Sequence, residues 1–316
     1  MSLIEKAAQR LEELRRAGIE VPVDGKDEVY KDLDSHQKAN KVLIALPDPS
    51  LERGGSGNSQ NATSIAKAAN RLGNYFELDL ARLAARGFVT PDIQRSRIAD
   101  EFRILKRPLI GNISAKKAVP IKHANLVMVT SSVPGEGKTF CAVNLAMSLA
   151  TELDKTVLLV DADVARPALP AILGLPPAQG LLDVLENKGI RLGDVLLRTN
   201  VEKLTVLPSG TPHPHATELL ASSSMAQLLE ELSARYPDRI IVFDSPPLLV
   251  TTESRVLASQ MGQIAFVVHA ESTLQADVKR ALATIESCPV KLLVLNQART
   301  VGQGAHGYGY GYGYGA

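Results

Sequence analysis

Hydrophobic positions in the later two thirds of the chain form short, nearly continuous runs, and stretches with helical spacing separate them. These apolar runs lie at 126–131, 157–161, 204–208, 240–244, 264–270 and 292–296. The stretches with apolar residues at helical spacing lie at about 139–152, 217–234 and 273–286. A strand that is apolar at every position is typical of a sheet covered on both faces. The pattern therefore predicts an α/β fold with a doubly wound, mostly parallel sheet.

Two helical stretches and a polar segment precede this region. The opening SLIEKAAQRLEELRRAG has a capping box of Ser2 and Glu5 and an apolar stripe, so it predicts an amphipathic helix that ends at Gly18. So short a helix needs a surface to pack on: its own domain, a second copy or a partner protein. The segment LERGGSGNSQNATS has the composition of a flexible linker, and SRIADEFRILKRPLI predicts a second helix. We divide the chain into a helix at 1–23, a flexible or irregular region at 24–80, a main domain at 81–300 and a tail at 301–316.

Composition narrows the class of protein. The 316 residues include 35 Lys and Arg against 34 Asp and Glu, so there is no general attraction to nucleic acid. Two cysteines are too few for a disulfide framework, and the chain shows neither a signal segment nor an apolar run long enough to span a bilayer. The sequence therefore predicts a cytoplasmic protein.

The first apolar run ends in SSVPGEGKTF, residues 131–140, directly before a helical stretch. A strand that turns through glycines into a helix points free backbone N–H groups and the positive helix end at one spot, which suits a polyphosphate. This is close to a P-loop, with Ser132 at the first glycine position, Lys138 reaching the phosphates and the Thr139 hydroxyl placed on Mg²⁺. The predicted ATP contacts here are Pro134, Gly135, Glu136, Gly137, Lys138, Thr139 and Phe140.

Acidic residues end two further strands. IIVFDSPP places Asp244 after an apolar run, and VLLVDADVARP places Asp161 and Asp163 two residues apart. Carboxylates beside a triphosphate repel it unless a metal or a proton offsets them, which favours Mg²⁺ and a general base. We predict that Thr139, Asp161 and Asp244 hold Mg²⁺. Asp161 or Asp163 is the predicted base, with Asp163 orienting the metal as the alternative.

The chain ends in GYGYGYGYGA, which carries four of its seven tyrosines, Tyr308, Tyr310, Tyr312 and Tyr314. Taken alone, a Gly-rich end is typical of a disordered tail. In an extended tail, however, residues two apart face the same side, so each tyrosine is presented in the same orientation.

The set SSVPGEGKT, VLLVDADVARP and IIVFDSPP resembles the three Walker-type motifs of bacterial tyrosine kinases, P-loop enzymes that regulate export of capsular and extracellular polysaccharide. The resemblance covers about residues 95–300, and LPSGTPHPHATELLASSSMAQLLEEL is similar to the segment between the second and third motifs. The opening helix and EFRILKRPL resemble the free-standing branch associated with exosortase-linked clusters. The resemblance implies ATP and Mg²⁺ as cofactors and autophosphorylation of the tyrosine tail.

The resemblance also implies roles for residues outside the motifs, and it has two departures. Ala165 takes the place of an arginine in the second motif, and Arg166 follows it. The family's E-x-x-R-x-x-R helix, which contacts a neighbouring subunit in a ring, is here Asp100-x-x-Arg103-x-x-Lys106, and Lys lacks the bidentate fork of Arg. Asn296 ends the last strand, where related P-loop proteins contact adenine.

The partners implied by the resemblance are copies of this chain, a membrane polysaccharide co-polymerase whose cytoplasmic tail activates the kinase, and a cognate tyrosine phosphatase. They would place the protein in the cytoplasm at the inner membrane. Two alternatives stay open. One is an ATPase switch of the MinD/ParA type, although the second P-loop lysine of that class is missing from SSVPGEGK. The other is a non-catalytic scaffold gated by nucleotide.

Overall fold

Each of the six apolar runs forms a strand of one sheet, which confirms the predicted doubly wound fold. A computed structural model describes residues 74–93, 95–114, 120–187, 189–236 and 238–298. The predicted helix at 1–23, nearly all of the region at 24–80 and the tail tyrosines lie outside the described residues. No helix in the described part of the chain combines the length and the apolar character needed to cross a bilayer.

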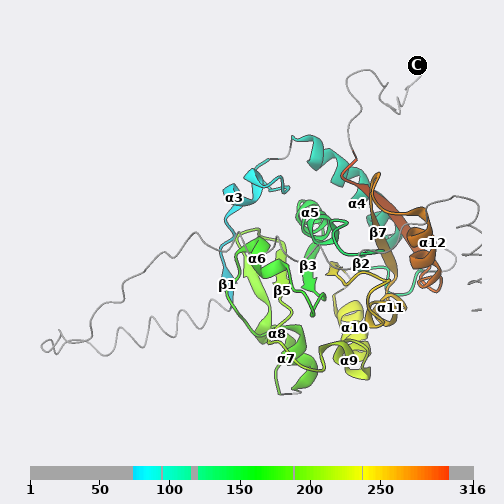
Figure 1. The fold of residues 1–316 in the computed structure, drawn as a ribbon. Coiled ribbons are helices and arrows are strands. Elements are labelled where there is room, and N and C mark those ends of the chain that lie inside the picture. The colour runs from blue at the N-terminus through cyan, green and yellow to red at the C-terminus, as the bar shows by residue number, and fades with distance from the viewer. Residues whose placement is uncertain (1–73, 94, 115–119, 188, 237, 299–316) are drawn as a thin grey trace, which may run out of the picture. The chain divides into compact units, whose positions relative to one another are not determined.

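The strands and helices alternate along the chain (Figure 1). The strands are β1 (Tyr75–Phe76), β2 (Leu126–Ser131), β3 (Thr156–Asp161), β4 (Leu197–Thr199), β5 (Leu204–Leu207), β6 (Arg239–Asp244), β7 (Gln263–His269) and β8 (Val290–Asn296). The helices are α3 (Leu80–Ala85), α4 (Arg97–Ser114), α5 (Lys138–Ala150), α6 (Leu169–Leu173), α7 (Leu181–Glu186), α8 (Leu192–Val195), α9 (Ala216–Leu220), α10 (Ser223–Arg235), α11 (Glu253–Ala258) and α12 (Gln275–Ala283).

The sheet has the strand order β1-β4-β5-β3-β6-β2-β7-β8. Neighbouring strands run parallel except at the β4–β5 pair, which is antiparallel. The carboxyl ends of β2, β3 and β6 therefore meet at one edge of the sheet, with β6 in the middle. Ligands of open α/β sheets bind at this edge.

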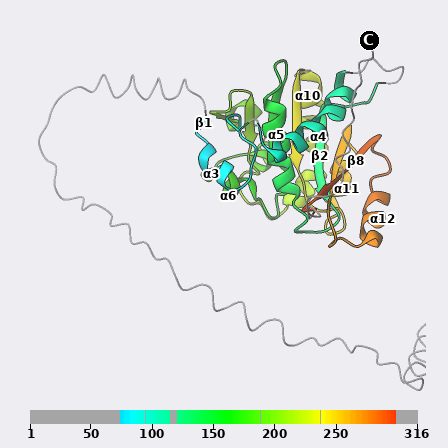
Figure 2. The same cartoon turned by 90° about the horizontal axis from the view of Figure 1, so that it is seen from above.

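Helices cover both faces of the central strands, as their apolar character requires, whereas Leu293 and Leu295 of the edge strand β8 are exposed. One core layer joins α4 and α5 to the sheet, and the other joins α7, α10, α11 and α12 to the opposite face. In Figure 1, α5 lies above the strands, and α9 and α10 lie below them. Figure 2, seen from above, places β8 beside α12 at one side of the domain. Helix α5 is buried along nearly all of its length, so the P-loop helix is part of the core.

Three details differ from the predictions. The helix expected over 217–234 is two helices, because the Ser222 hydroxyl accepts a hydrogen bond from the backbone N–H of Met225 and starts α10 anew. Strand β1 lies before residue 81, where the main domain was expected to begin, and it pairs with β4. Lys106 was expected at a contact with a neighbouring subunit, yet it is only 3% exposed. Its long alkyl stem lets the ammonium group reach polar partners at the end of α5.

Candidate functional site

The P-loop is shaped by two glycines in the left-handed region. Gly135 and Gly137 have φ angles of 87° and 91°, which side chains of L-residues rarely adopt. A Cβ atom on Gly137 would also lie 2.0 Å from the side-chain nitrogen of Asn296. Gly137 caps α5 without a side-chain hydrogen bond, so backbone N–H groups of the first turn are left for a ligand.

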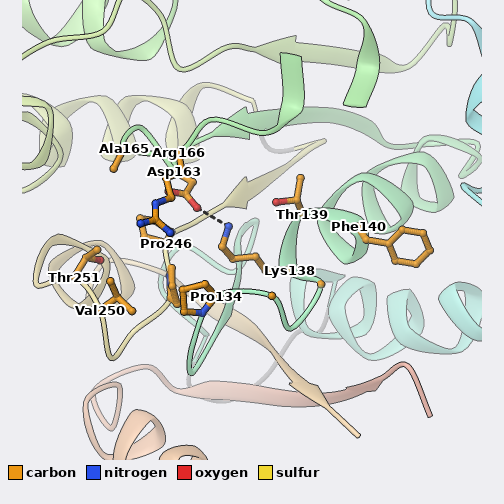
Figure 3. A pocket seen from close by; sticks show the side chains of 13 residues that line it. Pro134, Lys138, Thr139, Phe140, Asp163, Ala165, Arg166, Pro246, Val250 and Thr251 are labelled. Atoms are coloured by element: carbon orange, nitrogen blue, oxygen red, sulfur yellow. Dashed lines mark hydrogen bonds and ion pairs between the residues drawn. The ribbon is translucent and has the colours of Figure 1, made fainter. Parts of the chain in front are cut away.

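Lys138, the first residue of α5, forms an ion pair with Asp163 just beyond the end of β3. Its Nζ lies 2.5 Å from Asp163 Oδ2, and the two side chains are 13% and 7% exposed. Figure 3 shows this pair facing the cavity, with the Thr139 side chain beside it. The lysine expected to bind phosphate is therefore paired with a carboxylate that lines the same cavity.

Asp161 and Asp244 lie side by side at the ends of adjacent strands. They are partners in the β3–β6 register, and both are fully buried. All four of their carboxylate oxygens are buried without a hydrogen-bond partner among the described residues. Burial raises the pKa of Asp161 well above its ordinary value, and the charges of Asp244 and Asp163 raise it further. Burial also raises the pKa of Asp244 to about 6, although the Lys138 charge and the Thr139 side chain oppose the shift.

Lys138, Thr139 and Asp163 line a cavity of about 410 Å³ at the carboxyl edge of the sheet. P-loop residues and Asp163 form one part of its lining, and Pro246, Pro247, Val250 and Thr251 form another. Arg166 also lines it, so the arginine that is displaced by one position in the sequence still reaches the site. Figure 3 shows Arg166 on the same side of the cavity as Asp163.

The unpartnered carboxylates fit a divalent cation. Charged oxygens buried without partners are costly unless a cation or a proton compensates them. Mg²⁺ prefers oxygen ligands and usually takes one or two carboxylates together with substrate phosphates. The described residues contain no cluster of three or more His, Cys, Asp or Glu side chains able to hold a metal. Phosphate oxygens would therefore have to complete the coordination of an ion held by Asp161, Asp244 and Thr139.

Three side chains predicted to contact ATP make contacts within the domain, although Phe140 also lines the cavity. The Phe140 ring turns away from Lys138 in Figure 3 and packs on Phe88, with ring centres 5.0 Å apart. The Glu136 carboxylate is buried in contacts within the domain. Asn296 donates from Nδ2 to the backbone carbonyl of Glu136 at 2.9 Å. The backbones of Glu136 and Phe140 belong to the loop and to the first turn of α5, and the side chains of Glu136 and Asn296 support the shape of the loop.

The residues predicted for a subunit interface divide into two groups. Asp100 and Arg103 are exposed on α4 and pair with each other. Lys106 is buried and donates to Ser148 O at 2.6 Å, and it also pairs with Glu152 at 2.8 Å. Asp100 and Arg103 therefore lie at the surface of the domain, whereas Lys106 belongs to its interior.

Comparison with known proteins identifies the family. Residues 124–288, more than half of the chain, match the model of the AAA domain family AAA_31. The chain is 34% identical to the tyrosine-protein kinase YwqD of Bacillus subtilis over 167 residues, which are 53% of this chain and 69% of the relative. It is 31% identical to the putative tyrosine-protein kinase CapB of Staphylococcus aureus, over 65% of this chain and 87% of the relative. The chain belongs to the bacterial tyrosine-protein kinase family.

A solved structure supports the same assignment for the fold of this kinase. The chimerical protein CapA2B2 superposes with a TM-score of 0.54 at 29% identity, over 64% of this chain and 86% of that one. Matches to other tyrosine-protein kinases cover only 22 to 24% of those longer chains. The predicted P-loop kinase domain and its ATP-dependent tyrosine kinase class are therefore confirmed, and the family is linked to capsule and exopolysaccharide synthesis.

Sequence reasoning missed several residues of the site. Thr251 lines the cavity, and its buried hydroxyl has no partner among the described residues. Thr273, in the turn after β7, donates a hydrogen bond from its hydroxyl to the carboxylate of Glu136 in the P-loop. Neither residue belongs to a recognisable motif. Thr251 follows β6 and Thr273 follows β7, and only the folding of the chain brings these loops to the site.

Proposed function

We propose that this kinase transfers the γ-phosphoryl group of Mg-ATP to its own tail tyrosines, Tyr308, Tyr310, Tyr312 and Tyr314. The observation that supports this most is the place of the Lys138–Asp163 pair, which lines the cavity at the carboxyl edge of the sheet, where β3 and β6 end in the buried, unpartnered carboxylates Asp161 and Asp244. A phosphate cradle, a cation beside it and buried oxygens able to bind a metal are together the parts that phosphoryl transfer needs.

Binding of the nucleotide exchanges the partner of Lys138. In the structure, its ammonium group is paired with Asp163. A triphosphate in the cavity offers more negative charge, so the ammonium turns to the β- and γ-phosphates, and Asp163 is released. Mg²⁺ held by Thr139, Asp161 and Asp244 would neutralise charge that develops on the transferred group. Arg166 brings another cation to the same cavity.

The tyrosine needs a base, since a phenol has a pKa near 10. Asp163 lines the cavity and Asp161 is fully buried, which favours Asp163 as the group that meets the substrate hydroxyl. The carboxylate accepts the phenolic proton, and the phenolic oxygen forms a bond to the γ-phosphorus. The bond from that phosphorus to the β,γ-bridging oxygen breaks, and ADP leaves.

The tail is long enough for transfer within one chain or between copies. Twelve residues separate Asn296 from Tyr308, which is at most ~40 Å when extended. We favour transfer between subunits of a ring, with Asp100 and Arg103 at the contact, on the resemblance to the family. A dilution series separates the routes, because only transfer between copies slows as the protein concentration falls.

Four phosphotyrosines would add roughly −6 to −8 to a chain of formal charge +1. Such tails repel one another, so phosphorylation would loosen an assembly, and a cognate tyrosine phosphatase would reset it. We further propose that a membrane polysaccharide co-polymerase recruits the kinase to the inner membrane and activates it through a cytoplasmic tail. The amphipathic helix that the sequence predicts at 1–23 would offer a further surface for such a partner.

Mass spectrometry of the C-terminal peptide tests the proposal after incubation of the purified chain with Mg-ATP. We expect phosphate on the tail of the wild type, and none on Lys138→Met or on a variant with all four tail tyrosines changed to Phe. Lys279→Met, an exposed change on α12, is the matched control and should retain phosphorylation. Steady ATP hydrolysis with an unmodified tail, even with a co-polymerase tail added, would favour the switch alternative instead.

A further inference from the structure

The second residue of the GEGK stretch faces away from the nucleotide cavity. Gly135 and Gly137 line that cavity, but Glu136 between them does not. Glu136 is 2% exposed and instead borders a separate cavity of about 390 Å³ between the P-loop and the start of α12. Burying a carboxylate is costly unless it accepts hydrogen bonds. The hydrogen-bond partners of Glu136 therefore explain why it can be buried in the loop.

Both oxygens of Glu136 are bonded. Oε2 accepts the backbone N–H of Val133, in the first half of the P-loop, at 2.7 Å. Oε1 accepts the hydroxyl of Thr273. The carboxylate thus closes the loop on itself and ties it to the turn between β7 and α12.

Thr273 is itself fixed in that turn. Its hydroxyl oxygen accepts the backbone N–H of His269 at 3.1 Å, and its own N–H donates to the His269 carbonyl at 3.0 Å. Because His269 is the last residue of β7, the anchor is part of the central sheet. The hydroxyl therefore has a defined donor direction, toward Glu136.

A second tie holds the same peptide. Asn296 donates to the carbonyl of Glu136, and the backbone N–H of Ala270 donates to the Asn296 carbonyl at 2.9 Å. The ends of β7 and β8 are thereby joined to each other and to the P-loop. The two left-handed glycines give the loop conformational freedom that these contacts restrict.

We propose that Glu136, Thr273 and Asn296 are positioning residues that hold the P-loop in its phosphate-binding shape before ATP arrives. The loop binds through backbone N–H groups whose directions must be set in advance, since ordering a free loop on binding costs affinity. The Thr273 hydroxyl is the key contact, because without it one oxygen of the buried Glu136 carboxylate is left without its partner. This inference rests on nucleotide binding at the P-loop and not on the identity of the phosphate acceptor.

Substitution of Thr273 tests this directly. Thr273→Val keeps the shape and removes the hydroxyl, and we expect it to weaken binding of Mg-ADP, measured by calorimetry, by about tenfold. Thr273→Ser restores the hydroxyl and should bind as the wild type does. Thr284→Val is the matched control, because the Thr284 hydroxyl bonds only to the carbonyl of Ala281 within the neighbouring turn of the chain.

Two further readouts separate positioning from a general loss of stability. In steady-state kinetics, Thr273→Val should raise the KM for ATP and leave kcat at saturation close to that of the wild type. The double variant Glu136→Ala, Thr273→Val should bind Mg-ADP no worse than Glu136→Ala alone. Both substitutions remove the same hydrogen bond between Thr273 and Glu136, so the second has no further bond of this kind to break. Unchanged affinity in Thr273→Val, or a Thr273→Ser variant as weak as Thr273→Val, would overturn the inference. An unphosphorylated tail would refute the proposed acceptor and leave these affinities unaffected.

Discussion

Replacing Asp244 by Asn should stabilise the nucleotide-free domain and disable the enzyme. The Asp244 carboxylate is fully buried, and both of its oxygens lack hydrogen-bond partners among the described residues. Burial raises its pKa from 3.8 to about 6. The folded state therefore holds an extra proton between these two pH values. The free energy of unfolding falls as the pH rises through this window, and it stays lower above it.

The shift gives the size of the effect. About two pH units correspond to roughly 3 kcal/mol of lost stability at pH 8. Asp244→Asn removes the ionisation, so its advantage over the wild type should grow from about 1 kcal/mol at pH 4.5 to about 3 kcal/mol at pH 8. For a domain of this size, the larger value is a rise in Tm of roughly 6 to 12 °C.

Thermal unfolding without nucleotide or Mg²⁺, followed from pH 4.5 to pH 8, measures this difference. Asp154→Asn is the control, because the Asp154 side chain is 77% exposed and its charge is already solvated. The reasoning fails if the gap between Asp244→Asn and the wild type does not widen with pH. Addition of Mg-ADP should stabilise the wild type more than Asp244→Asn, and kinase activity should be lost in that variant.

Three other substitutions or reactions test separate parts of the structure. Lys106→Met should lower the free energy of unfolding in urea by about 3 kcal/mol, because the Glu152 carboxylate, the Ser148 carbonyl and the Thr151 hydroxyl lose their cation. Arg107 is exposed, so Arg107→Met should have little effect. Gly137→Ala should reduce Mg-ADP affinity more than tenfold, because its φ is strained and its new methyl group meets Asn296; wild-type affinity would contradict the loop geometry. Burial and the charge of Asp244 raise the pKa of Cys141 to about 12. A thiol reagent at pH 8 should therefore modify Cys141 only as the domain unfolds. Rapid labelling of Cys141 in the native protein would refute this.

The sequence by itself determined the local parts of this kinase. Six nearly continuous apolar runs predicted six strands within one or two residues, because strands in the middle of a sheet that is covered on both faces are apolar at nearly every position. Lys138 and Thr139 were found because a phosphate cradle needs glycines followed by a helix start, and this requirement is local. The three acidic residues were found because Asp161 and Asp244 each end an apolar run, and Asp163 follows two positions after Asp161.

Only the tertiary structure decided which of these groups meet and which way they face. The strand order puts β3 beside β6, and this pairing brings Asp161 next to Asp244, 83 positions apart in the sequence. Packing of α4 on α5 turned Lys106 inward, and the turn after β7 drew Glu136 away from the cavity. Such contacts join residues far apart in the chain, and their geometry depends on the register and crossover of every strand between them. Composition and residue spacing do not determine that register. The direction in which each side chain points was therefore not predictable from the sequence alone.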